Sequence, residues 1–299
     1  MIMGIAGTVP GLPRRPLGRT GLSVPVLGLG TAPAGHRPEP EAVAFFRRCL
    51  DSGVTHVDTG PQRAGFGNAQ RYLGQLLEQR RADVFVATRC CEPDGERALA
   101  QLKQNLTELR IEQADLVYVH SIGDDNMEPA TIFASGGVCQ ALEKARRDGL
   151  TRLLGVSGHH RPGRFVQALE EWDFDVMMNP VSIVSRHIYN FEEHVWPLAR
   201  KKGIGLFGMK VFGGVRESAK SAKGAHLPDA LKPLAIRYAL GLPGVAGVAI
   251  GLHDDDELRQ TVEWVRAYYS PPTSEQLLAH ETVTRDLAGQ WGALYGPRA

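Results

Sequence analysis

Polar side chains that can transfer protons or bind anions follow a series of short apolar segments in this chain. The positions where these segments end hold Thr31, Asp58, Arg89, His120, Ser157 with His159, Asn179, Lys210 and Gly251 with His253. Charged residues are costly to place at the end of a buried strand unless they are paired or used. If the segments form one parallel sheet, their ends converge. That convergence favours an enzyme active site over a structural polar network.

The side chains at these ends suit acid–base chemistry beside an anion. Asp58 and His120 are candidates for the acid and the base. Arg63 and Arg89 can each clamp a carboxylate or an oxyanion, but a guanidinium stays protonated and cannot serve as a general acid. The proton donor would then be His120 or His159.

The segments themselves predict strands. They are rich in β-branched residues or leucine, which is typical of parallel strands buried on both faces, and they span residues 26–30, 55–58, 84–89, 116–120, 153–157, 176–179, 205–210 and 245–251. Helical periodicity fills the gaps between them, for example after Asp94, a candidate N-cap. Strand–helix units of about 30 residues predict a closed (β/α)8 TIM barrel. The alternative is an open doubly wound sheet, although LGLGTAPAG after the first strand contains no GxGxxG opening a helix.

The barrel is expected to carry an addition at each end. Residues 14–26 contain a turn at 19–21 between two short runs and predict a β-hairpin. Residues 274–289 predict a helical appendage, because no strand precedes them. No shift in composition marks a linker, so we expect a single domain over 1–299 with the barrel at about 26–268.

Composition limits the possible partners. The 299 residues are 43% apolar and 22% charged with a net charge of +1, which is ordinary for a soluble globular protein and argues against nucleic acid. Neither a signal peptide nor a run of 18 apolar residues occurs, so we expect a cytoplasmic protein without a membrane partner. A small-molecule substrate remains as the expected partner, and a monomer is the default.

Several reactive residue types are better explained by packing. Tyr118 lies about 6.6 Å deeper than His120 on the same strand face and predicts a core aromatic. The adjacent His159 and His160 cannot easily chelate one ion, so no metal is predicted. The cysteines form no CxxC and are expected to be free thiols with packing roles; a thiol beside Arg89 would have a lowered pKa only if it were partly exposed at the rim. They are Cys49, Cys90, Cys91 and Cys139.

Several motifs, in one order along the chain, resemble the aldo-keto reductase superfamily. They are LGRTGLSVPVLGLGT, GVTHVDTGP, VFVATR, ADLVYVHS, LLGVSGHH and GIGLFGMKVFGG, over about residues 14–268, and GGVCQAL and SGH are similar to a bacterial branch. The resemblance implies hydride transfer from a nicotinamide to a carbonyl, whose oxygen is protonated by a tyrosine tuned by a lysine, an aspartate and a histidine. A phenol of pKa about 10 donates near pH 7 only if its anion is stabilised.

The family's catalytic group is only partly present. Asp58 matches its aspartate and His120 its histidine, whereas Arg89 stands in the lysine position and Arg63 in the tyrosine position. The loop after Asp58 contains no tyrosine, and its aromatic residue, Phe66, has no hydroxyl.

The resemblance also implies a dinucleotide site. Met178 stands where the family has a glutamine for the nicotinamide amide, and the glycines after the seventh strand would let backbone N–H groups approach phosphate oxygens. Asp254 would repel a 2′-phosphate but suits a ribose diol, so we expect NADP(H) or NAD(H) with weak selectivity, or no cofactor at all. The implied cofactor residues are Ser157, Gly158, Lys210, Gly213, Gly214, His253 and Asp254.

Three functions follow from these observations. The first is an aldo-keto-reductase-like oxidoreductase that acts on a small carbonyl or sugar-like substrate, with Asp58, Arg89 and His120 retained. The second is a lyase, isomerase, dehydratase or cyclase on the same barrel, with Asp58 and His120 as acid and base and the two arginines binding an anionic group. The third is a binding or regulatory protein, such as an ion-channel accessory subunit. The expected substrate contacts are Arg63, His159 and His187.

Overall fold

The computed structural model describes residues 11–213, 227–268 and 270–299. Its centre is a closed barrel of parallel strands in the order β10-β3-β4-β5-β6-β7-β8-β9. Their bounds are β3 Leu27–Gly30, β4 His56–Asp58, β5 Phe85–Cys90, β6 Ala114–His120, β7 Thr151–Ser157, β8 Val176–Pro180, β9 Gly205–Met209 and β10 Val245–Gly251. The predicted (β/α)8 TIM barrel is confirmed. The open sheet is excluded because β10 pairs with β3, with Val248 opposite Leu27.

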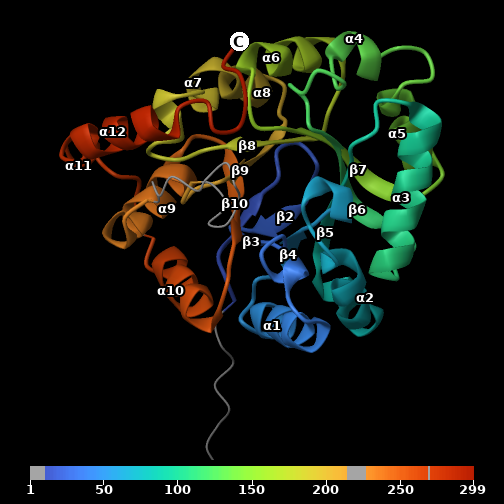
Figure 1. The fold of residues 1–299 in the computed structure, drawn as a ribbon, viewed down its shortest axis with the longest axis horizontal. Coiled ribbons are helices and arrows are strands. Elements are labelled where there is room, and N and C mark those ends of the chain that lie inside the picture. Colours follow the sequence, from blue (N-terminus) through green and yellow to red (C-terminus); the bar gives the residue numbers. More distant parts are fainter. Residues whose placement is uncertain (1–10, 214–226, 269) are drawn as a thin grey trace, which may run out of the picture.

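Helices surround the barrel (Figure 1). They are α1 Glu39–Asp51, α2 Ala69–Arg80, α3 Gly95–Leu109, α4 Pro129–Ile132, α5 Val138–Arg147, α6 Pro162–Glu171, α7 Phe191–His194, α8 Trp196–Lys201, α9 Lys232–Gly241 and α10 Asp255–Arg266. In α3 the buried residues Ala98, Leu102 and Leu106 recur every fourth position, which places them on one face. The predicted N-cap is confirmed, since the Asp94 side chain accepts a hydrogen bond from the Arg97 amide.

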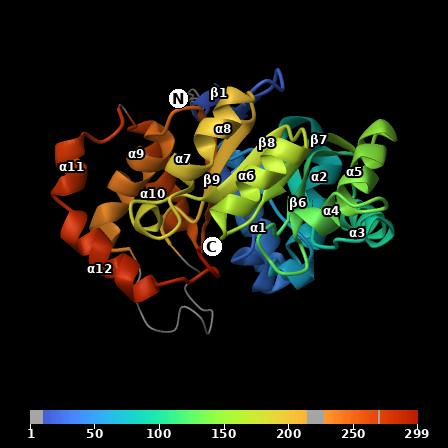
Figure 2. The same ribbon diagram turned by 90° about the horizontal axis from the view of Figure 1, so that it is seen from above.

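The predicted N-terminal hairpin is also confirmed. Strands β1 (Arg14–Pro16) and β2 (Ser23–Pro25) pair antiparallel, and Figure 2 shows β1 at one edge of the molecule. Leu17 and Val24 are fully buried in the cluster that includes Leu116 and Tyr118. The hairpin therefore packs against side chains of the barrel strands.

The C-terminal appendage is two helices instead of the single one expected over 274–289. Helix α11 (Ser274–Leu278) has no buried residue, whereas α12 (Glu281–Trp291) buries Thr284, Leu287, Ala288 and Trp291. The spacing of these four residues places them on one face of α12. The turn at 279–280, between the two helices, lets that face pack against the rest of the protein. Both helices lie at the end of the molecule opposite α3 and α5 (Figures 1 and 2).

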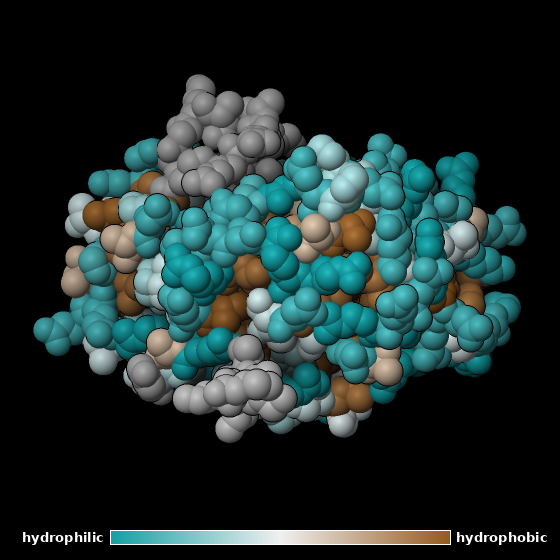
Figure 3. Space-filling model, turned by 90° about the horizontal axis from the view of Figure 1, so that it is seen from below, coloured by the Kyte–Doolittle hydropathy of each residue, from teal (hydrophilic) through white to brown (hydrophobic). Residues whose placement is uncertain are grey.

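The outer surface is mainly polar. Hydrophilic residues dominate the face shown in Figure 3, and the exposed large hydrophobic residues among those described are Leu278 and Val283 of the C-terminal helices. Within the described ranges, no helix combines the length and the apolarity needed to cross a membrane.

The barrel interior contains an unpaired histidine. His56 of β4 is fully buried against the rings of Phe85 and Phe207, and within the described part of the chain neither ring nitrogen has a hydrogen-bond partner. Burial lowers its pKa to about 3. The unfolded chain therefore binds more protons than the folded protein below the ordinary histidine pKa, and His56 makes folding less favourable as the pH falls.

Replacing His56 by leucine is expected to flatten the acid side of the stability profile. Between pH 7.5 and 5.0, His56 lowers the free energy of unfolding of the wild type by about 2 kcal/mol. Over the same interval, the free energy of unfolding of the variant should therefore fall by about 2 kcal/mol less. Urea unfolding at the two pH values measures the difference. His194→Leu, at an exposed position, is the matched control, and an unchanged pH dependence in His56→Leu would contradict the assignment.

Candidate active site

The centre of the barrel mouth is a buried ion pair between neighbouring strands. Asp58 ends β4, and its Oδ1 accepts from Nη2 of Arg89 on β5; the two side chains are 8% and 3% exposed. Arg89 also donates from Nε to the Thr59 carbonyl at 3.0 Å, and its guanidinium carbon lies 4.5 Å from the centroid of the Phe66 ring. The Asn105 amide of α3 donates to the Arg89 carbonyl at 3.0 Å. The guanidinium is therefore held in one position.

The two arginines at this rim have separate partners. Arg89 is paired with Asp58, whereas Arg63, in the short helix Gln62–Ala64, is 45% exposed and pairs with Glu92. Burial raises the pKa of Asp58 above its ordinary value, although the charges of Arg89 and Lys210 oppose this shift. Each guanidinium already holds a carboxylate, so an anionic substrate would compete with an existing ion pair.

His120 ends β6 beside this ion pair. Its Nδ1 lies 2.8 Å from Ser157 Oγ at the end of β7, and the ring of His159 follows at 5.5 Å between centroids. Burial lowers the pKa of both histidines well below the ordinary value, and the positive charges of Arg89 and Lys210 act in the same direction. Both imidazoles are therefore neutral near pH 7, and neither is an imidazolium acid.

Lys210 follows β9 with a left-handed backbone conformation, φ 56°. This conformation is uncommon outside glycine and is concentrated at functional sites. Burial lowers the pKa of the amine, and Arg89 lowers it further, while Asp58 raises it. Gly213, three residues on, has φ 97°, and a Cβ there would meet the ring of Trp291 at 2.3 Å. The neighbouring Gly214 lies outside the described residues.

A residue absent from the sequence-based site also lies at this mouth. Tyr295, in the segment after α12, has its ring centroid 5.6 Å from that of His159 and 5.9 Å from Lys210 Nζ. Its hydroxyl is buried without a hydrogen-bond partner among the described residues. The aromatic residue in GALYGPRA was the only available signal, because nothing local indicates that this tail returns to the barrel.

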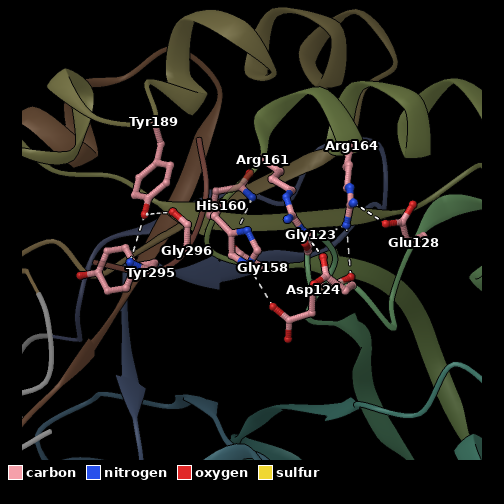
Figure 4. A network of polar contacts seen from close by, with 12 residues as sticks. Gly123, Asp124, Glu128, Gly158, His160, Arg161, Arg164, Tyr189, Tyr295 and Gly296 are labelled. Carbon is pink, nitrogen blue, oxygen red and sulfur yellow. Dashed lines mark hydrogen bonds and ion pairs between the residues drawn. The ribbon is translucent and has the colours of Figure 1, made fainter. Parts of the chain in front are cut away.

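Hydrogen bonds to its backbone hold the C-terminal segment in place (Figure 4). The Tyr189 hydroxyl donates to the Gly296 carbonyl at 2.9 Å and accepts from the Tyr295 amide at 3.0 Å. The Arg161 amide donates to the Pro297 carbonyl at 3.1 Å. The segment thus joins the loops after β7 and β8 at the mouth.

Gly158 and His160 shape the same loop. A Cβ on Gly158 would lie 2.3 Å from the Ile122 carbonyl, so the loop after β7 packs directly on the backbone that follows β6. His160 Nε2 lies 2.9 Å from Asp124 Oδ1, and its ring lies against Gly296 (Figure 4).

Three further predicted site residues make local contacts at the mouth. The Asp254 side chain caps α10 by accepting from the Glu257 amide at 2.8 Å, and His253 Nδ1 lies 3.0 Å from Glu257 Oε2. That hydrogen bond lowers the pKa of Glu257 to about 2. His187 Nε2 lies 3.2 Å from Thr284 Oγ1 of α12, and thus links the loop after β8 to the C-terminal helix.

The thiols beside Arg89 are not activated by it. The four cysteines are free, and burial raises the pKa of Cys90 and Cys91. Desolvation outweighs the attraction of the guanidinium because Cys90 is fully buried against α3, where its thiol contacts the Ala98 carbonyl, and Cys91 is partly buried. In the described ranges, no group of three or more histidine, cysteine or acidic residues is arranged to hold a metal ion.

Comparison with known families identifies the family of the chain. The model of the aldo/keto reductase family matches residues 26–277. The chain belongs to the aldo/keto reductase family. The sequence-based resemblance is therefore confirmed, and the chain is assigned to a family of oxidoreductases.

Two curated relatives match most of the chain. L-galactose dehydrogenase of Arabidopsis thaliana is 24% identical over 302 residues, covering 89% of this chain and 92% of the relative. Pyridoxal 4-dehydrogenase of Microbacterium luteolum is also 24% identical, covering 84% and 92%. An aldo-keto reductase from Bacillus halodurans, solved in its holo form, superposes with a TM-score of 0.72 at 23% identity, covering 91% of this chain and 96% of that one. The structural likeness establishes the shared fold.

Proposed function

We propose that this aldo/keto reductase transfers a hydride between a nicotinamide cofactor and a small carbonyl or sugar-like compound at the barrel mouth. The buried Asp58–Arg89 ion pair beside His120 carries the proposal. Breaking such a pair leaves an unpaired buried charge, and perturbed ionisable groups of this kind are concentrated at functional sites. In a member of this family, redox chemistry is the function that best fits the pair.

The end of β7 suits the amide of a nicotinamide. Ser157 pairs in register with Met178, whose side chain lies in the cluster inside the barrel, so the Ser157 hydroxyl faces the mouth, 2.8 Å from His120 Nδ1. A hydroxyl can donate to, or accept from, a carboxamide. We assign the amide end of the cofactor to Ser157 and Gly158, and the phosphate end to Gly213 and Lys210.

The bound cofactor would supply the hydride, and the chain would orient the carbonyl. Arg89 supports Asp58 and directs its positive charge toward the oxygen on which negative charge develops. His120, held by Ser157, offers a neutral N–H or lone pair at a fixed position. His159 lines the substrate side, and His253 and Asp254 border the expected adenosine end. Because Asp254 would repel a 2′-phosphate, we expect little preference for NADP(H) over NAD(H).

Fluorescence titration with NADPH and NADH tests the proposal. Saturable binding of at least one reduced cofactor in the micromolar range, with quenching or enhancement, is expected. Oxidation of the bound cofactor on addition of an aldehyde, followed by absorbance, would extend the result to turnover. No binding of either cofactor at millimolar concentration would overturn the redox proposal and favour a lyase or isomerase that uses Asp58 and His120.

A further inference from the structure

The main chain at Arg89 lies where the pairing of β5 with β4 ends. The Thr59 amide donates to the Ala87 carbonyl at 2.9 Å, and the next donor along this parallel ladder would be the amide of residue 61. That position is a proline, which has no N–H. The Arg89 carbonyl therefore needs a donor from outside the sheet, and the Asn105 side chain supplies it at 3.0 Å.

Asn105 belongs to a ring of hydrogen bonds on the outer side of β5. The Thr88 hydroxyl donates to Gln70 Oε1 at 2.7 Å, and Gln70 Nε2 donates to Asn105 Oδ1 at 3.1 Å. Gln70 lies on α2 and Asn105 on α3, which are neighbouring helices outside this part of the barrel (Figure 1). Because Asn105 Nδ2 donates back to Arg89, the ring starts and ends on adjacent residues of one strand.

The three polar side chains of this ring lie in an otherwise apolar interface. Thr88, Gln70 and Asn105 are each at most 1% exposed, whereas most of the large side chains buried on α2 and α3 are leucines. Apolar side chains of similar shape would give about the same stability, because buried hydrogen bonds gain little beyond the cost of desolvation. A fully paired buried network does, however, make the structure around it rigid. The ring therefore fixes the backbone from which the Arg89 side chain extends.

We propose that Asn105, oriented by Gln70 and Thr88, is a positioning residue for the ion pair between Asp58 and Arg89. By holding the Arg89 carbonyl from outside the barrel, it keeps the guanidinium against the Asp58 carboxylate at the mouth. The effect on turnover rests on the proposed function, whereas the positioning itself can be measured without a substrate.

A shift of the Arg89 backbone would be passed on to the ion pair. A Cβ on Gly60 would lie 3.0 Å from both Cγ and Cδ of Arg89, and the Phe66 ring centroid lies 4.5 Å from the guanidinium carbon. The enclosed side chain has little room to compensate by changing its rotamer, so the guanidinium would move relative to Asp58. A misplacement of about 1 Å at a reacting centre can cost about 100-fold in rate.

The first test removes the donor from the ring. Asn105→Leu is expected to lower kcat by about 10- to 100-fold for NADPH with 4-nitrobenzaldehyde or an aldose as probe, while KM and the Kd for NADPH change by less than about twofold. In an Arg89→Met background, Asn105→Leu should lower kcat no further, because it acts through Arg89. Thr88→Val removes one hydroxyl from the same ring and should give a smaller decrease that adds little to that of Asn105→Leu.

The matched control removes a side-chain donor from main-chain carbonyls at the other end of the barrel. Arg15 Nη1 donates to the Leu240 and Val245 carbonyls at 2.6 and 3.2 Å, and Val245 is the first residue of β10. Arg15→Met therefore costs comparable hydrogen bonds without a connection to the ion pair, and should retain wild-type kcat.

Chemical labelling measures the positioning without turnover. Phenylglyoxal modifies accessible guanidinium groups, and the Arg89 side chain is 3% exposed within its ion pair. Peptide mass spectrometry can compare its labelling with that of Arg110, which is 49% exposed. In Asn105→Leu the relative labelling of Arg89 should rise by at least about fivefold, because the pair opens more often, and in Arg15→Met it should stay at the wild-type value.

The outcomes separate this inference from the proposed function. If Asn105→Leu retains wild-type labelling of Arg89, or lowers kcat equally in the Arg89→Met background, the positioning role is wrong. If the wild type turns over no probe, the proposed function fails, and the labelling of Arg89 still decides the inference. Circular dichroism and thermal unfolding establish that each variant is folded, and Thr88→Val serves for the same comparisons if Asn105→Leu does not fold.

Discussion

Replacing Asp58 by asparagine is expected to destabilise the protein and remove most of its turnover. The change leaves the Arg89 guanidinium, 3% exposed, without its carboxylate. Breaking a buried ion pair by removing one partner costs about 3–5 kcal/mol. The Thr59 carbonyl still accepts from Arg89 Nε, so we expect the lower part of that range. Urea unfolding at pH 7.5 measures the loss, and cofactor oxidation with an aldehyde measures turnover.

A double variant distinguishes the structural role of the pair from its chemical role. In Asp58→Asn with Arg89→Met, neither position of the pair carries a charge, so much of the lost stability should return while turnover stays low. Arg110→Met disrupts an ion pair with Glu78 in which both side chains are about half exposed, and should cost no more than about 1 kcal/mol. If Asp58→Asn is as stable as the wild type, or if the double variant regains activity, the account of the pair is wrong.

The site divides into parts that were predictable from the sequence and parts that were not. Asp58 and Arg89 were predictable because each follows an apolar run, and parallel strands place such positions at one end of a barrel. Their pairing follows from the adjacency of β4 and β5. By contrast, the contact between Arg63 and Glu92 depends on loop conformation, which the types and spacing of the residues do not determine.

Protonation states were also beyond sequence reasoning. His120 could be proposed as a proton donor from its position, but its ionisation depends on burial and on cations from other strands. The Cys91 thiol is a second example. The arginine beside it favours a lowered pKa, but desolvation has the larger effect and raises the pKa. Both shifts depend on how much water the closed barrel and its loops exclude.

The C-terminal segment was the largest omission. Helical periodicity after 274 indicated an appendage, but not the turn at 279–280 that seats Thr284 and Trp291. From Trp291 the chain can return to the mouth in a few residues and place Tyr295 there. The segment after α12 pairs with no strand of the barrel, so no strand register fixes its position. Where it packs depends on tertiary contacts such as those of Tyr189.

The contact between Gly213 and Trp291 joins this appendage to the loop after β9, and Gly213→Ala is expected to disrupt both. An alanine at φ 97° is strained by about 1–2 kcal/mol, and its Cβ would also meet the Trp291 ring at 2.3 Å. We expect a stability loss of about 2–4 kcal/mol. If the glycine lies under cofactor phosphates as proposed, NADPH affinity should fall at least about tenfold, because the loop must move to relieve the contact.

A double-mutant cycle separates backbone strain from the collision with the ring. Trp291→Ala alone should cost about 3–5 kcal/mol through the cavity it leaves, but it removes the atoms that the new Cβ would strike. In the Trp291→Ala background, Gly213→Ala should therefore cost only the backbone strain. Gly163→Ala, in α6 with nothing within 4 Å of the added Cβ, is the matched control and should be neutral or slightly stabilising. Equal effects of Gly213→Ala in both backgrounds would show that the loop and the C-terminal helix are not coupled through this contact.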